Sequence, residues 1–262
     1  MRSRAVRAVI PTGFGINCEA ETAHAFQLAG AAVEPVHLND LIEDPALLAG
    51  SQILALAGGF SFGDHLGAGK VLANRLRRRL GQALSRFVED GGLVLGICNG
   101  FQTMVRIGLV PHGGLGEQTV ALAPNRHGCF LDGWVTLAVD PDSPCVFTRG
   151  MTTLQVPVRH GEGRVIAAGD QLDRIRACHL APVRYADAAT GQPTERFPDN
   201  PNGSVDSIAG LCDGTGRVFG LMPHPEAFLH PQNHPGWRRR DLATREGDGL
   251  ALFRNAVAAA SR

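Results

Sequence analysis

The chain has 262 residues, which is enough for one large domain or two small ones, and it carries 25 basic and 25 acidic side chains with a pI near 7.1. This balance excludes a global electric field that would attract nucleic acid or an acidic membrane, so any partner must be recognised locally. The N-terminal stretch lacks the apolar core and cleavage site of a secretory signal, and no apolar run reaches membrane-spanning length. We therefore expect a cytoplasmic protein with no nucleic-acid partner and no membrane partner.

In the first 110 residues, short apolar runs alternate with segments of helical periodicity. The periodicity predicts strands over 4–10, 31–38, 51–57 and 93–97, and helices over 19–29 and 66–90. Strands that alternate with helices are typical of a parallel, doubly wound sheet. The fold class expected is therefore α/β, with a mostly parallel central sheet flanked by helices.

Beyond residue 118 the pattern changes to shorter apolar runs separated by loops rich in Gly, Pro, Asn and Asp. These runs predict additional strands over 119–123, 134–139, 154–158, 181–186 and 217–222, and a final helix over 246–260. No linker or internal repeat divides the chain, so we expect a single domain over residues 1–262. The sequence leaves the role of segment 227–246 open.

Six cysteines occur without a C-x-x-C pair, which predicts free thiols, and five of them suit an interpretation as inert buried residues. Cys98 is different, because Gly-Ile-Cys-Asn-Gly has the spacing of a nucleophile elbow with cysteine in place of serine. The strand should end at Ile97 and a helix begin at Asn99, whose N-terminus would favour the reactive thiolate. The pentapeptide alone fits a structural cysteine in a strand-to-helix turn equally well.

A nucleophile needs a base, and the segment Gly-Leu-Met-Pro-His-Pro-Glu provides one. His224 follows an apolar strand and lies between Pro223 and Pro225, which should hold the segment extended. In an extended chain, residues two apart point to the same side, so Glu226 could orient the imidazole. We expect Cys98, His224 and Glu226 to form a catalytic triad.

The loop over residues 57–70 is glycine-rich but lacks the Walker A spacing of a phosphate-binding loop. It follows a buried strand, so its backbone N–H groups could join that of Asn99 in an oxyanion hole above Cys98. Gly59 is the preferred donor, and Phe60 is the alternative if the turn is displaced by one residue.

Two further histidine patterns carry weaker signals. His230 and His234 have a helical metal-ligand spacing, but Pro231 and Pro235 oppose a regular helix, so we expect no metal site. His160 lies in a glycine-flanked segment that is compatible with a substrate or partner contact or with an exposed turn.

The chain resembles the class I (triad) glutamine amidotransferases through Gly-Ile-Cys-Asn-Gly-Phe-Gln, Gly-Gly-Phe and the late His-Pro-Glu. It is more closely similar to the glutaminase subunits (subunit I) of phosphoribosylformylglycinamidine synthase. The motifs HGEGR, FPDNPNGSVDSIAGL and GLMPHPE follow in the order of that family and extend the resemblance over nearly the whole chain. The chain departs from the family pattern at Phe62, His127, Cys129, Gly133 and Ala227.

The resemblance implies a flavodoxin-like class I glutamine amidotransferase fold with additional strands and loops. It implies that Cys98 attacks the side-chain amide of glutamine, that His224 gives a proton to the leaving ammonia, and that water then releases glutamate. Gln102 matches a family position that contacts bound glutamine, Phe60 belongs to the same glutamine-binding region, and Asn125 would border this pocket.

The resemblance also implies a synthetase subunit that receives the ammonia and converts formylglycinamide ribonucleotide to formylglycinamidine ribonucleotide in purine biosynthesis. ATP and Mg²⁺ would bind to that partner, a third small subunit could join the complex, and this chain would hold no cofactor of its own. Two alternatives stay open: an amidotransferase or cysteine hydrolase of another pathway, and a non-catalytic redox sensor that uses Cys98.

Overall fold

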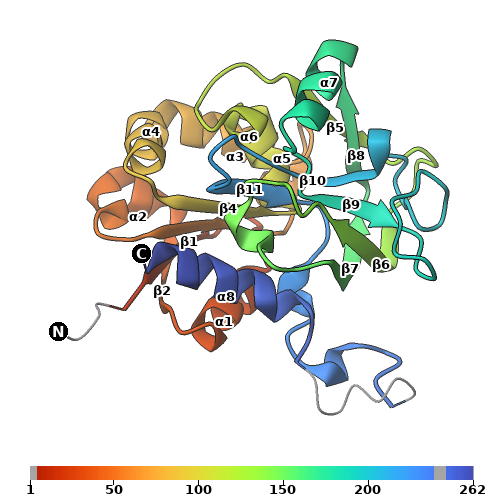
Figure 1. The fold of residues 1–262 in the computed structure, drawn as a ribbon. Coiled ribbons are helices and arrows are strands. Elements are labelled where there is room, and N and C mark those ends of the chain that lie inside the picture. The colour runs from red at the N-terminus through yellow and green to blue at the C-terminus, as the bar shows by residue number, and fades with distance from the viewer. Residues whose placement is uncertain (1–4, 239–245, 262) are drawn as a thin grey trace.

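The computed structural model describes residues 5–238 and 246–261, and its centre is a nine-stranded sheet (Figure 1). The strand order is β2-β1-β3-β4-β11-β10-β9-β6-β7. The first five strands in this order run parallel, and each later neighbour pairs antiparallel. The strands of this sheet are β1 (Arg7–Thr12), β2 (Ala32–His37), β3 (Ile53–Leu56), β4 (Leu93–Ile97), β6 (Leu131–Val139), β7 (Thr153–His160), β9 (Val183–Ala186), β10 (Ile208–Cys212) and β11 (Val218–Leu221).

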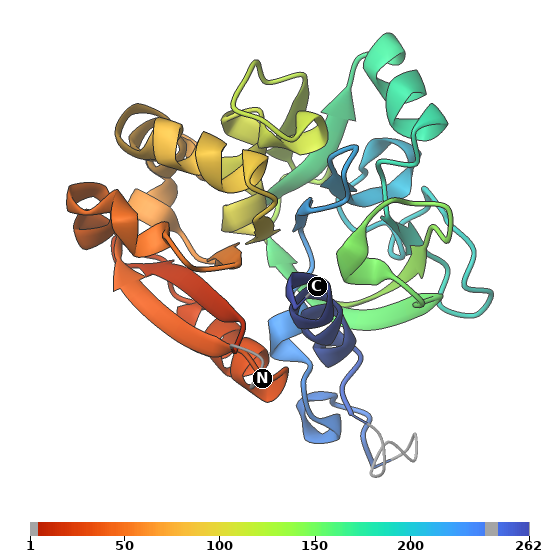
Figure 2. The ribbon, with the colours of Figure 1, turned by 60° about the vertical axis from the view of Figure 1, so that its left-hand side comes forward.

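Helices cover both faces of the parallel half of the sheet (Figures 1 and 2). Helices α1 and α8 lie side by side on one face, and α3, α4, α5 and α6 lie on the other. A small antiparallel ribbon of β5 (Val120–Pro124) and β8 (Glu162–Ala167) stands beside α7. The helices are α1 (Glu19–Leu28), α2 (Leu38–Glu43), α3 (Lys70–Arg75), α4 (Gly81–Glu89), α5 (Asn99–Arg106), α6 (Leu109–His112), α7 (Gly169–Ala177) and α8 (Gly249–Ala260).

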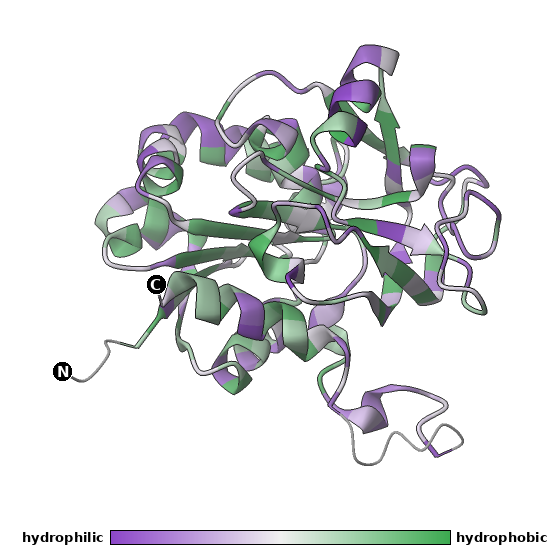
Figure 3. Cartoon of the chain, viewed as in Figure 1, coloured by the Kyte–Doolittle hydropathy of each residue, from purple (hydrophilic) through white to green (hydrophobic). Residues whose placement is uncertain are grey.

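The core lies between the sheet and its helices, as the hydropathy colouring of Figure 3 shows. Every residue of β3, β4, β10 and β11 is buried, which explains why these strands are continuous apolar runs rather than alternating ones. Phe26 of α1 and Phe253 of α8 are fully buried and meet edge to face at 4.9 Å. This aromatic pair joins the two helices that cover the lower face in Figure 1.

The α/β fold with a mostly parallel sheet, flanking helices and additional strands is confirmed. Strand β4 has the predicted bounds, but the helix predicted over 66–90 begins at Lys70, after Gly69 in a left-handed conformation, and passes through a π-helical segment at Leu76–Leu80. None of the described helices combines the length and apolar character needed to cross a bilayer. The single domain over 1–262 stays a prediction. Part of the open segment 227–246, residues 239–245, lies outside the described residues.

Candidate active site

Cys98 occupies a strand-to-helix turn between β4 and α5. Its backbone angles are φ 51° and ψ −104°, a conformation that L-residues rarely adopt, and its N–H donates to the carbonyl of Leu221 at 2.8 Å. Such strain is characteristic of a nucleophile elbow and lifts the side chain above the carboxyl edge of the sheet. The predicted elbow, with the strand ending at Ile97 and the helix beginning at Asn99, is confirmed as a local geometry.

The glycines around Cys98 allow α5 to pack directly on the sheet. A Cβ atom on Gly100 would lie 1.9 Å from the backbone oxygen of Leu56 in β3, and one on Gly96 would lie 2.2 Å from Sδ of Met104. Neither position can carry a side chain without a shift of its neighbours. These glycines therefore fix the height of the α5 N-terminus, and with it the position of Cys98.

His224 reaches the same edge of the sheet from the neighbouring strand. Strand β11 pairs parallel with β4, so that Leu221 lies opposite Ile97, and His224 follows three residues later. The backbone N–H of His224 donates to Pro157 of β7 at 2.8 Å, which ties this segment to the antiparallel half of the sheet. The register of one strand pair thus brings residues 98 and 224 together.

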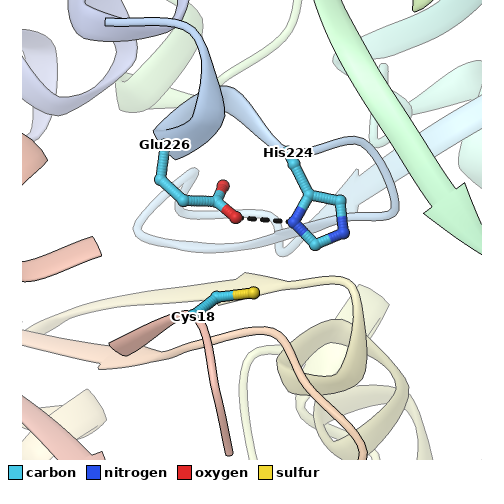
Figure 4. A group of neighbouring side chains, drawn as sticks. All are labelled: Cys18, His224 and Glu226. Carbon is cyan, nitrogen blue, oxygen red and sulfur yellow. Dashed lines mark hydrogen bonds and ion pairs between the residues drawn. The ribbon is translucent and has the colours of Figure 1, made fainter. Parts of the chain in front are cut away.

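Glu226 orients the imidazole, although not through the predicted extended chain. Nδ1 of His224 and Oε1 of Glu226 are 2.5 Å apart, and both residues are buried (Figure 4). The segment Pro225–Ala227 is a 3₁₀ turn in which the N–H of Ala227 bonds the carbonyl of His224. The expectation of extended backbone was therefore wrong at these residues, because Pro225 begins this turn, and the turn brings the carboxylate back to the ring.

The electrostatic environment of His224 favours the charged imidazolium. Burial alone lowers the pKa of His224, but the negative charges of Glu226 and of the Cys98 thiolate outweigh burial, so the net shift of its pKa is well upward. In the described part of the chain, Nε2 of His224 has no hydrogen-bond partner. This nitrogen is therefore available to a thiol, a leaving group or a water molecule.

Cys18, interpreted from the sequence as an inert cysteine, lies at the same place. Its Sγ, a nitrogen of His224 and a carboxylate oxygen of Glu226 all lie within 4.8 Å of one another. Figure 4 shows the three side chains as neighbours. These three groups could bind a soft metal ion, although His224 and Glu226 already bond to each other. The expected absence of a metal site stays a prediction.

A cavity of about 540 Å³ opens above Cys98, which is a suitable size for a small metabolite. Residues from both halves of the sheet and from the loop after β3 form its wall. They are Asn17, Cys18, Gly59, Phe60, Asp64, Ala68, Cys98, Gln102, Pro124, Phe130, Arg159, His160, Gly161, Glu162 and His224.

Two backbone N–H groups near Cys98 are candidates for binding a developing oxyanion. The N–H of Phe60 donates to the carbonyl of Gly15 at 2.9 Å, whereas that of Gly59 has no acceptor among the described residues. Asn99 is the first residue of α5, where a helix leaves its N–H groups free. The structure therefore favours Gly59 over Phe60 as the first donor, with Asn99 as the second, and the oxyanion-hole role itself stays a prediction.

The predicted glutamine-binding residues occupy different positions relative to the cavity. Gln102 lines it, donates to the carbonyl of Glu162 at 2.5 Å and accepts from the Asn99 side chain at 2.9 Å. Phe60 lines it with a half-exposed ring. Asn125 is buried next to the lining residue Pro124, and its amide bonds Cys129 and His160. Their contacts with glutamine stay predictions.

His160 is a buried residue of the cavity wall. It ends β7, is 2% exposed, and bonds Asn125 at 3.0 Å and Asn202 at 3.5 Å through its ring nitrogens. The alternative of an exposed turn was therefore wrong. The ring of His160 would lie 2.6 Å from a Cβ atom on Gly163, so the glycines of this segment make room for a buried imidazole rather than for a loop.

Four cavity residues with a charged or thiol side chain have no catalytic or binding role in the sequence interpretation: Cys18, Asp64, Arg159 and Glu162. Glu162 stands inside HGEGR, a motif that carried the family resemblance, and Asp64 lies in the glycine-rich loop over residues 57–70. The sequence therefore indicated the region of both residues but not their chemistry. Arg159 and Cys18 lie at no spacing that predicts a site, and only the folded chain brings them to the cavity.

Comparisons with known proteins agree with this geometry. The chain matches the CobB/CobQ-like glutamine amidotransferase domain over residues 5–258. It is 45% identical over 252 residues to phosphoribosylformylglycinamidine synthase subunit PurQ of Dehalococcoides mccartyi, with 96% of each chain covered. It is 40% identical over 262 residues to the protein of that name from Methanococcus maripaludis, again with 96% of each chain covered.

Solved structures show the same fold. A chain in the structure of PurLQS from Thermotoga maritima is similar with a TM-score of 0.71 and 28% identity, covering 97% of this chain and 99% of that chain. A glutamine amidotransferase from Thermotoga maritima, 17% identical with a TM-score of 0.53, covers 97% of each chain and shares the fold alone.

Proposed function

The chain belongs to the family of CobB/CobQ-like glutamine amidotransferase domains, and on this premise we propose how its cavity hydrolyses glutamine. It is the glutaminase subunit of a phosphoribosylformylglycinamidine synthase, and it supplies ammonia to a synthetase subunit in purine biosynthesis. The observation that carries the mechanism is the convergence of the strained Cys98 with the buried His224–Glu226 pair at one cavity.

In the first half-reaction, the Cys98 thiolate attacks the side-chain amide carbon of glutamine. The carbonyl oxygen becomes an oxyanion that accepts hydrogen bonds from the N–H groups of Gly59 and Asn99. His224, charged beside Glu226, gives its proton to the amide nitrogen, so the C–N bond breaks and ammonia leaves. A γ-glutamyl thioester remains on Cys98.

In the second half-reaction, the neutral His224 takes a proton from water, and the resulting hydroxide attacks the thioester. The C–S bond breaks, the new carboxyl group releases its remaining proton to solvent, glutamate leaves, and Cys98 and His224 return to the ion pair. Glu226 keeps the imidazole in one tautomer through both steps, because its Oε1 lies 2.5 Å from Nδ1 and leaves Nε2 as the reacting atom.

The ammonia must reach the partner without first equilibrating with water, where most of it would be protonated and lose its nucleophilicity. We therefore propose that it passes directly to the synthetase subunit. In this proposal ATP and Mg²⁺ bind to that partner, this chain holds no cofactor, and a third small subunit can complete the assembly.

We also propose a cytoplasmic location, which is supported by the free thiols of all six cysteines, since thiols persist in a reducing compartment. Fractionation of cells followed by immunoblotting tests this location. Recovery of the subunit from an extracytoplasmic fraction would contradict it.

The triad proposal is tested in the reconstituted complex by comparing glutamine-dependent with ammonia-dependent synthesis. Cys98→Ala and His224→Ala should each reduce the glutamine-dependent rate by at least about 10³-fold, while the ammonia-dependent rate stays within about twofold. Cys178→Ala is a matched control at an exposed cysteine and should leave both rates unchanged. Retained glutamine-dependent synthesis in Cys98→Ala would show that another group is the nucleophile.

The two alternative functions fit these residues less well. A redox sensor needs a reactive thiol but has no use for the His224–Glu226 pair. An amidotransferase of another pathway would share the triad, but it would not account for identities of 40–45% over nearly the full length of the synthase subunits.

A further inference from the structure

The charged side chains of the cavity differ in whether they already have hydrogen-bond or ion-pair partners within the protein. Glu162 is satisfied: its Oε1 accepts from Arg106 at 3.0 Å, and its Oε2 accepts from the N–H of Ala68 at 3.5 Å. His224 is paired with Glu226. Two charged groups of opposite sign remain in the wall of the cavity, on Asp64 and Arg159.

Asp64 has one carboxylate oxygen committed to the protein and one free. Oδ1 accepts from the N–H of Gly69 at 3.3 Å and from the Asn99 side chain at 3.1 Å. Oδ2 has no partner among the described residues, and burial raises the pKa of Asp64 although its hydrogen bonds and the positive charges of Arg106 and His65 act in the other direction. A bound ammonium group would donate a hydrogen bond to this free oxygen.

Arg159 carries the opposite charge, and one of its donors lacks a hydrogen-bond acceptor among the described residues. Its Nε is buried and has no acceptor within the described ranges. A buried donor that is left unpaired destabilises the protein, so a donor of this kind calls for an acceptor. The carbonyl oxygen of Arg159 also lies 3.8 Å from Sγ of Cys98, so this residue adjoins the nucleophile.

We propose that Asp64 and Arg159 are specificity-determining residues that bind the α-ammonium and α-carboxylate groups of glutamine, respectively. The inference rests on the proposed function and adds to it the means by which the site recognises a free amino acid. Glutamine carries its reacting amide at one end and two opposite charges at the other, and these match the two unsatisfied groups of the wall. A glutamine residue within a peptide lacks both charges and would be rejected.

The test uses the reconstituted complex and two analogues that each lack one charge. Glutaramate has no α-ammonium group, and 4-aminobutanamide has no α-carboxylate group. For Asp64→Asn we expect the KM for glutamine to rise about tenfold to hundredfold with a smaller change in kcat, the range expected for loss of a charged hydrogen bond. The inhibition constant of glutaramate should change less than threefold, because this analogue makes no contact with Asp64.

For Arg159→Gln the pattern is reversed: the KM for glutamine rises by a similar factor, and inhibition by 4-aminobutanamide is unchanged. Glu117→Gln and Arg78→Gln are matched controls at exposed residues outside the cavity and should behave as the wild type. Ammonia-dependent synthesis shows in every case that the complex is assembled.

An unchanged KM for glutamine in either variant would overturn the assignment of that residue. Equal losses for glutamine and for the analogue that lacks the relevant charge would also overturn it, because a merely structural defect weakens all ligands alike. Failure of the proposed function would appear differently, as a wild-type complex that does not hydrolyse glutamine at all.

Discussion

At the scale of single residues, His160 is a titratable side chain that the fold keeps neutral. Burial lowers its pKa to about 3, and the nearby charges of His224 and His127 act in the same direction. An unfolded histidine titrates near pH 6.5, so the unfolded chain binds more protons than the folded one between about pH 3 and 6.5. Stability therefore rises with pH through this window and is lost as the pH falls.

The prediction is a steeper loss of stability in the wild type than in His160→Gln. Each pH unit below 6.5 should remove about 1.4 kcal/mol that is due to His160, or about 2 kcal/mol by pH 5, and the variant should lack this contribution. Urea unfolding at several pH values between 5 and 7.5 measures it. His65→Gln, at an exposed histidine, is the control and should keep the wild-type slope. Parallel pH profiles for His160→Gln and the wild type would contradict the prediction.

The three residues of the proposed triad could be singled out individually because each has a strong local signal. Cys98 lies between two glycines after an apolar strand, and His224 lies between two prolines with a carboxylate two residues later. Asp64 and Arg159 have no such signal, because their significance is that the fold leaves them without partners. Whether a polar group has a hydrogen-bond partner depends on all of its neighbours in space, and the spacing of residues in the sequence does not specify those neighbours.

At the scale of elements, α5 depends on the absence of a side chain at one position. A Cβ atom at residue 100 would lie 1.9 Å from a backbone oxygen of β3, which cannot rotate away. We expect Gly100→Ala to reduce the free energy of unfolding by about 3 kcal/mol or more, at the upper end of the range for overpacking, and to displace Cys98. Urea unfolding and glutamine-dependent synthesis measure the two effects.

Gly114→Ala is the matched control, because a Cβ atom there would meet nothing within 4 Å. It should change stability by less than about 0.5 kcal/mol. If Gly100→Ala were as stable and active as Gly114→Ala, the close packing of α5 would not be what positions Cys98.

Buried parallel strands were predicted well, and strands near glycine motifs were not. Strand β4 is an unbroken apolar run with buried residues throughout, so its bounds followed from hydropathy alone. Strand β8 begins within His-Gly-Glu-Gly-Arg, where the glycines suggested a turn. The glycine at 163 is instead explained by the space that the His160 ring requires. Glycine occurs both at turns and where another part of the chain packs closely against the backbone, and the sequence alone does not distinguish these two cases.

At the scale of the whole molecule, the central sheet brings residues that are distant in the sequence together at one site. The parallel half places the carboxyl ends of β3, β4 and β11 next to one another, so that Gly59, Cys98 and His224 share an edge. The antiparallel half supplies the opposite wall through β7, which carries Arg159 and His160. The alternating pattern of the first 110 residues predicted four of the five parallel strands, β1 to β4, whereas the position of β11 and the strand order of the second half have no counterpart in the local sequence.

The central claim is that Cys98, rather than another group in the cavity, attacks glutamine, and trapping the covalent intermediate tests it most directly. The complex is mixed with glutamine, quenched in acid within milliseconds, digested and analysed by mass spectrometry. We predict a γ-glutamyl thioester on the peptide that contains Cys98, formed at least about 10²-fold more slowly in His224→Asn. A γ-glutamyl group on Cys18, the second thiol beside His224, would contradict the account, as would turnover of glutamine without any adduct on Cys98.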